Sequence, residues 1–125
     1  MMSVNPQSDL RLSATIDGER ARVTAEGNLD VYTAPLLRAE LIRVADAGAR
    51  RITVVLRAVN LIDSSGLNTL VFGYKLARAG GGEFTLCGDD KLVARLLART
   101  GLDRVIPLHH EPGNGGTGKA GAAGA

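Results

Sequence analysis

Two adjacent hydroxyl side chains stand out in the segment Asn60-Leu61-Ile62-Asp63-Ser64-Ser65-Gly66-Leu67. A buried-strand pattern precedes it, and the apolar residues that follow predict a helix beginning at these serines. A helix N-terminus exposes unpaired backbone N–H groups and a partial positive charge. A phosphate on Ser64 would therefore lie against a positive helix end. The same residues also suit a plain N-cap, since Ser, Asp and Asn are preferred there. From the residues alone the cap is the commoner explanation, and both interpretations stay open.

Other residue types that often carry chemistry indicate no second site. Cys87, the single cysteine, lies in an apolar run and is predicted to be a buried small hydrophobe. His109 and His110 are adjacent and lack further spaced ligands, so no metal or other cofactor is expected. The run 80–82 is three glycines without the Lys-Ser/Thr pair of a phosphate-binding loop. Ser64 is outside a G-x-S-x-G elbow. We therefore expect a protein that is not an enzyme.

Composition and charge narrow the class of protein to a small domain that binds neither nucleic acid nor membrane. The 125 residues suggest one domain. The net charge is only +2, with 15 basic and 13 acidic residues interspersed, so no nucleic-acid partner is expected. One cysteine cannot form a disulfide within the chain, no apolar run has membrane-spanning length, and the first residues lack a signal-peptide core. These features predict a cytoplasmic protein without a membrane partner.

The two ends differ from the middle of the chain. Residues 1–8 show little apolar periodicity, and residues 111–125 form a Gly/Ala-rich tail with no large apolar side chain. Such segments cannot offset their own ordering entropy. We expect both ends to be disordered and one domain to span residues 9–110.

Periodicity within that domain predicts an α/β fold. Alternating apolar residues predict a hairpin of strands over 10–16 and 21–25, and apolar runs predict strands over 52–56, 84–87 and 105–108. Helices are expected between Thr33 and Gly48, Asp63 and Gly80, and Asp89 and Gly101. The order is β-β-α-β-α-β-α-β. It predicts a mixed, mostly parallel central sheet with an N-terminal antiparallel hairpin and helices mainly on one face. The inner face of the second helix is predicted to comprise Leu67, Leu70, Val71, Tyr74 and Ala77.

From Leu10 to about Leu108 the chain resembles the STAS domain of bacterial anti-sigma factor antagonists. The I-D-S-S-G-L motif at 62–67 resembles the family's phosphorylation loop, and G-N-L-D-x-x-T at 27–33 is similar to its G-E-L-D-x-x-T segment. The Gly-Gly-x-Phe strand entry at 81–84 and the T-G-L turn at 100–102 also fit, as do the order and spacing of the elements. The resemblance implies the STAS fold.

The resemblance also implies a function. A family member binds an anti-sigma factor that is also a serine kinase, and so frees a sigma factor. The kinase then phosphorylates the serine after the loop aspartate, here Ser64, the complex dissociates, and a serine phosphatase resets the switch. ATP and Mg²⁺ belong to the kinase. By resemblance, the partner-binding residues would be Asp30, Asp63, Ser64, Ser65 and Gly66.

The roles of individual residues stay open. Asp30 would orient the acceptor hydroxyl or contact the partner, or it would only begin a turn or cap the first helix. Gly66 would let the partner approach closely, or would only ease a tight turn, and Ser65 is expected to be a helix-start hydroxyl. Asn28 replaces the family's usual acidic residue, and Asn68 occupies a place that is often glycine. Both departures could alter the choice of partner.

Two other functions compete with the switch. One is a phosphorylation-independent sensor or scaffold that binds a nucleotide or other small anion at the Ser64 helix end. The other is a serine-dependent enzyme, which is remote because no general base lies near the loop in sequence.

Overall fold

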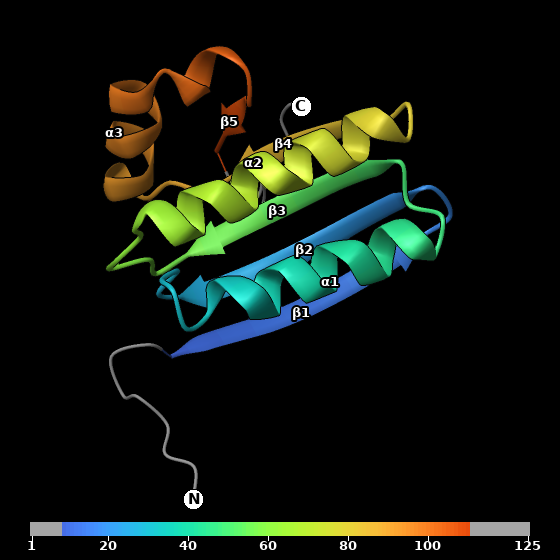
Figure 1. Ribbon diagram of the computed structural model, residues 1–125, viewed down its shortest axis with the longest axis horizontal. Helices are drawn as coiled ribbons and strands as arrows, with labels where there is room; N and C mark the ends of the chain where they lie inside the picture. Colours follow the sequence, from blue (N-terminus) through green and yellow to red (C-terminus); the bar gives the residue numbers. More distant parts are fainter. Residues whose placement is uncertain (1–8, 111–125) are drawn as a thin grey trace, which may run out of the picture.

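The computed structural model describes residues 9–110. The disorder predicted for residues 1–8 and 111–125 lies outside the described residues. Within them the chain forms the predicted α/β arrangement (Figure 1), with elements in the order β1 (Leu10–Asp17), β2 (Arg20–Gly27), α1 (Ala34–Asp46), β3 (Arg51–Arg57), α2 (Ser64–Ala79), β4 (Glu83–Cys87), α3 (Lys91–Thr100), a 3₁₀ turn (Leu102–Arg104) and β5 (Leu108–His109).

The sheet confirms the predicted topology. Its strand order is β1-β2-β3-β4-β5, with β1 and β2 antiparallel and the other neighbours parallel. The hairpin turns through Gly18, which has the positive φ of 62° that glycine adopts without steric cost. The parallel strands β2 and β3 both end at the same edge of the sheet, where the loops after them meet.

The last strand is shorter and later than the sequence pattern indicates. A strand over 105–108 is expected, but only Leu108 of that range is in β5. Val105 ends the 3₁₀ turn, and Ile106 is buried in the core. Pro107 has no N–H, yet its carbonyl accepts a hydrogen bond from Leu86 N at 2.9 Å. The apolar run therefore first packs Ile106 into the core, and strand pairing with β4 begins only at Leu108.

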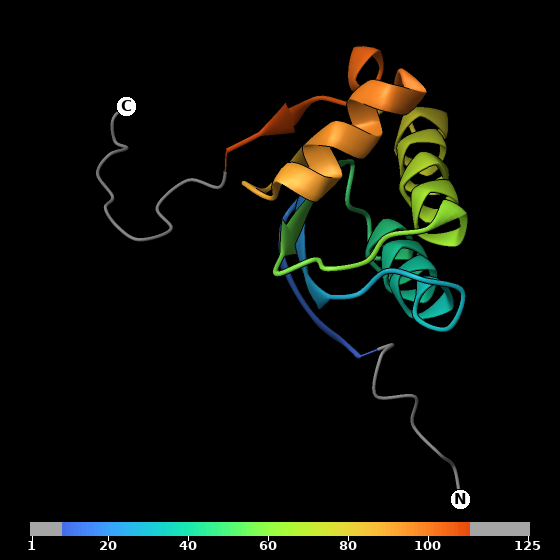
Figure 2. The same cartoon turned by 90° about the vertical axis from the view of Figure 1, so that its left-hand side faces the viewer.

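The helices cover one face of the sheet, as predicted, and Figures 1 and 2 show α1 and α2 lying side by side along it. Alternate residues of β2 and β3 point toward the helices and form the core with the inner faces of α1 and α3. The fully buried larger side chains include Leu37, Leu41, Ile52, Leu56, Leu86 and Leu97.

Small residues let α2 pack closely, which shifts its buried face from the predicted one. Leu70 and Ala77 are buried as expected, whereas Val71 and Tyr74 are only partly buried. Gly73 is buried instead. It packs so closely on Phe84 that a Cβ there would lie 2.6 Å from a ring carbon, so this position needs glycine. The apolar periodicity alone could not reveal this, since glycine contributes nothing to a hydrophobic pattern.

Candidate functional site

The two loops that follow β2 and β3 are joined directly. Leu29 N donates to Leu61 O at 2.9 Å, and Asp63 N donates to Leu29 O at 3.1 Å. Leu29 and Ile62 form an isolated parallel bridge and are both buried. These contacts extend the pairing of β2 and β3 beyond the sheet edge. They bring the segment that contains Asp30 next to the segment that contains Asp63.

Asp63 caps α2 and holds its first turn. Its Oδ1 accepts hydrogen bonds from Ser65 N at 2.9 Å and Gly66 N at 3.1 Å, and its carbonyl accepts one from Leu67 N. The N-cap predicted from the sequence is thus present. The capping side chain is that of Asp63, and neither serine side chain caps the helix. Ser65 is partly buried in the first turn of the helix.

Ser64 is the first residue of α2 and is exposed. Within residues 9–110 its hydroxyl forms no hydrogen bond. The helix behind it has 16 residues, so its N-terminus carries the full partial positive charge of a helix end. A phosphate on Ser64 could therefore reach solvent and the helix end together.

Gly66 is buried and packs against the loop after β2. A Cβ at Gly66 would lie 2.6 Å from Leu29 O and 2.9 Å from Leu29 Cβ. The position therefore needs glycine to let the two loops approach each other. This intramolecular contact was not among the roles weighed from the sequence.

Asp30 is the centre of a buried turn that leads into α1. Its side chain is 5% exposed, and Oδ1 accepts hydrogen bonds from Tyr32 N at 2.9 Å and Thr33 N at 3.1 Å. Thr33 Oγ1 accepts from Asp30 N at 2.9 Å and donates to Asn28 O at 2.8 Å. The turn-forming role predicted as one alternative is therefore present. The carboxylate fixes the backbone beside Ser64.

The segments that build this site also carry exposed apolar side chains, which we call the apolar rim: Val31, Tyr32, Leu36 and Leu61. Tyr32 is 66% exposed and Leu61 44% exposed. Val31 and Tyr32 project from the Asp30 turn, Leu36 from the first turn of α1, and Leu61 from the loop bonded to Leu29. Apolar groups clustered on a surface mark interaction sites. The rim was not predicted from the sequence. The usable signal was that Val31, Tyr32 and Leu61 are apolar residues in loops, outside every helix and strand period.

Replacing Asp63 by Ala is expected to lower the free energy of unfolding by about 1 kcal/mol, because two helix N–H groups lose their acceptor. Asp63→Asn should keep most of the stability, since Asn caps equally well. Urea denaturation would measure both variants. Equal losses in the two would contradict the capping role and indicate that the negative charge itself is what stabilises the turn.

Residues 9–110 contain no group of three or more His, Cys, Asp or Glu side chains that could hold a metal ion. None of the helices described has the length and apolar character needed to cross a bilayer. Cys87 is buried, as predicted.

Comparison with known sequences gives the family. Residues 11–113 match the profile of the STAS domain. The chain belongs to the STAS domain family. A STAS relative from Bacillus subtilis named an anti-sigma-B factor antagonist is 34% identical over 87 residues, covering 70% of this chain and 79% of the relative. An anti-sigma F factor antagonist of Paenibacillus polymyxa is 31% identical over 88 residues, covering 70% of this chain and 75% of the relative.

Solved structures agree with the STAS assignment. The crystal structure of a candidate anti-sigma factor antagonist from Thermotoga maritima superposes with a TM-score of 0.72 at 26% identity, covering 78% of this chain and 85% of that one. The resemblance read from the motifs is thus confirmed. Proteins of this kind are regulatory binding proteins and not enzymes, which agrees with the expectation from the sequence.

Proposed function

We propose that this STAS domain is an anti-sigma factor antagonist. It binds an anti-sigma factor that has serine kinase activity, releases a sigma factor, and is switched off when Ser64 is phosphorylated. A serine phosphatase restores the binding form, and the switch operates in the cytoplasm. The names of the relatives from Bacillus and Paenibacillus support the regulatory class.

One observation carries the proposal. The exposed hydroxyl of Ser64 stands at a helix N-terminus whose geometry is fixed by its neighbours, beside a rim of exposed apolar groups. The fixed geometry supplies a phosphate acceptor that a kinase can reach. The rim supplies the apolar area from which protein interfaces gain affinity. Acceptor and docking surface therefore adjoin, so that modifying one alters the other.

Intact mass tests the acceptor. The chain would be incubated with ATP, Mg²⁺ and candidate anti-sigma kinases, as wild type, Ser64→Ala and Ser65→Ala. We expect one added phosphate in wild type and in Ser65→Ala, and none in Ser64→Ala. Ser65 is the matched control because it is the neighbouring hydroxyl on the same helix turn. Phosphate uptake that persists in Ser64→Ala would overturn the assignment.

Truncating the rim is expected to weaken partner binding without affecting the fold. Tyr32→Ala should lower the affinity for the anti-sigma factor by about tenfold or more, since tyrosine is enriched among the residues that dominate interfaces. Its side chain is mostly exposed, so the free energy of unfolding should hardly change. Titration calorimetry and urea denaturation would measure the two effects.

Val105→Ala is the matched control for the rim. Val105 is an exposed apolar residue, at 48%, but it follows the 3₁₀ turn near α3. It should leave partner affinity unchanged. If both variants bind as tightly as wild type, the rim is not the docking surface.

A further inference from the structure

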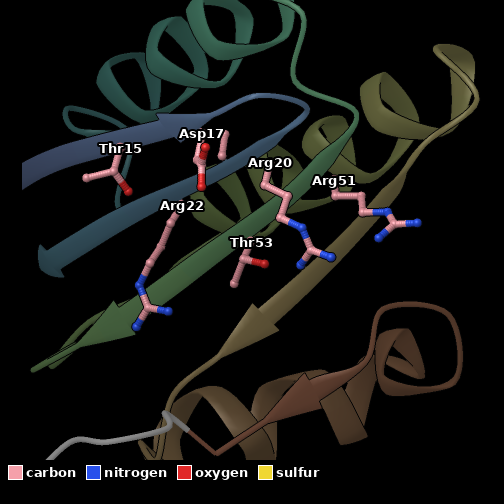
Figure 3. Close-up of a pocket in the computed structure, with 7 residues that line it drawn as sticks. Thr15, Asp17, Arg20, Arg22, Arg51 and Thr53 are labelled. Carbon is pink, nitrogen blue, oxygen red and sulfur yellow. The ribbon is translucent and has the colours of Figure 1, made fainter.

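The face of the sheet opposite α1 and α2 is polar and rich in arginine. The rows of paired residues follow from the strand register, and one row reads Asp17, Arg20, Arg51 and Glu83 from β1 to β4. The next row reads Thr15, Arg22, Thr53 and Thr85. Figure 3 views this face and shows the three arginine side chains projecting from it.

An open hollow of about 230 Å³ lies on this face. Its lining residues are Thr15, Asp17, Arg20, Ala21, Arg22, Arg51 and Thr53. The side chains that line it thus include three guanidinium groups and one carboxylate. The hollow is smaller than the roughly 300–1,000 Å³ of pockets that hold drug-sized ligands.

The arrangement of two of these arginines is unfavourable without a counter-ion. Arg20 and Arg51 are direct cross-strand partners, and like charges in that relation destabilise a sheet. Within residues 9–110 neither side chain forms an ion pair. Asp17 is the cross-strand neighbour of Arg20, and Glu83 is the cross-strand neighbour of Arg51. Each carboxylate therefore lies beside only one of the two arginines.

We propose that this hollow binds a small phosphate-type anion. Guanidinium groups bind oxyanions through paired N–H donors, and two of them on neighbouring strands can satisfy an anion's oxygens together. The hydroxyls of Thr15 and Thr53 also line the hollow, and Thr53 Oγ1 is hydrogen-bonded to Thr85 Oγ1 at 3.2 Å. The anion is expected to lie between Arg20 and Arg51, the cross-strand pair that forms no ion pair within residues 9–110.

The site is separate from the proposed switch. Arg20 and Arg51 begin β2 and β3, whereas the Ser64 loop follows the far ends of these strands. The hollow is also on the face that the helices leave open (Figure 3). Anion binding here therefore does not depend on phosphorylation at Ser64, and either proposal can fail alone.

Backbone NMR shifts on titration test the proposal. Inorganic phosphate and pyrophosphate would be added to the full chain at constant ionic strength, with chloride as the balancing anion. We expect saturable shifts centred on the amides of 20–22 and 51–53. Arg51→Gln and Arg20→Gln should each weaken binding by about tenfold or more, because each removes a charged donor pair. Arg95→Gln, an exposed arginine on α3, is the matched control and should bind as wild type.

Stability measurements separate binding from a structural role. In chloride buffer without phosphate or pyrophosphate, Arg51→Gln should be at least as stable as wild type because one like-charge contact is removed. Saturating pyrophosphate should raise the melting temperature of wild type and Arg95→Gln more than that of Arg51→Gln. Shifts that do not saturate, shifts centred on Ser64–Gly66, or equal affinity in all variants would overturn the proposal.

Discussion

Phosphorylation of Ser64 is expected to weaken binding to the anti-sigma factor by roughly a hundredfold while the domain stays folded. A phosphate adds about −1.5 to −2 charges at pH 7. One pair of like charges about 6 Å apart, at an effective dielectric near 20, repels by roughly 3 kcal/mol before screening. Any acidic group that the partner presents to this surface would therefore be repelled, and the bulk of the phosphate adds steric conflict beside the apolar rim.

The fold should tolerate the modification because Ser64 is exposed and its hydroxyl forms no hydrogen bond within the described residues. The positive end of α2 also favours an anion there, although the adjacent carboxylate of Asp63 opposes it. Titration calorimetry would give the two affinities. Backbone NMR of the same samples should show shifts confined to the loops around Ser64 and Asp30. Shifts throughout β2 and β3 would contradict local repulsion and indicate refolding.

Ser64→Asp provides a graded check. One carboxylate carries less charge and fewer acceptor oxygens than a phosphate. The loss of affinity should accordingly be smaller, about tenfold. Ala79→Asp is the matched control, because it places the same charge on an exposed position at the other end of the same helix. An equal loss from both substitutions would mean that general charge on α2, and not the Ser64 position, governs binding.

Gly66→Ala is expected to destabilise the domain by about 1–3 kcal/mol, as overpacking usually does. Alanine normally favours a helix over glycine by about 1 kcal/mol, so intrinsic propensity predicts the opposite sign. The packing effect should prevail because the new methyl group would lie 2.6 Å from Leu29 O and 2.9 Å from Leu29 Cβ. Both atoms belong to a buried residue that cannot move aside cheaply. The start of α2 would have to shift away from the Asp30 turn.

Gly80→Ala is the control for that experiment. A Cβ at Gly80 would meet its nearest atoms, the carbonyl oxygens of Ala77 and Leu76, at 3.6 and 3.8 Å, which is ordinary contact. Its stability should stay close to that of wild type in urea denaturation. Gly66→Ala should also bind the anti-sigma factor more weakly. A Gly66→Ala variant as stable as Gly80→Ala would show that the two loops are not held in close contact.

Most of the fold could be predicted because its signals are local. Alternation gave the hairpin of β1 and β2, and the Gly101 cap, with its positive φ of 80°, ends α3 as expected. The position of β5 could not be predicted, since the same short apolar run can pack on a core or pair with a strand. Only its neighbours decide between the two.

The sequence predicted which residues form the candidate site but not the contacts within it. The motif and family resemblance singled out Ser64, Asp63 and Asp30 together. The hydrogen bonds of Asp30 and the close approach at Gly66 depend on how two loops distant in sequence meet. The arginine hollow could not be predicted from the sequence for the same reason. Arg20 and Arg22 share a face by alternation, but Arg51 joins them only through the register of β2 on β3.

Release of the sigma factor tests the central claim most directly. A preformed complex of the anti-sigma factor and its sigma factor would be titrated with this chain, unmodified or fully phosphorylated on Ser64, while free sigma factor is measured. We expect release by the unmodified chain, with roughly a hundredfold more of the phosphorylated chain needed for the same release. Equal release by both forms would contradict the switch, and no release by the unmodified chain with any anti-sigma factor of the same genome would contradict the antagonist function itself.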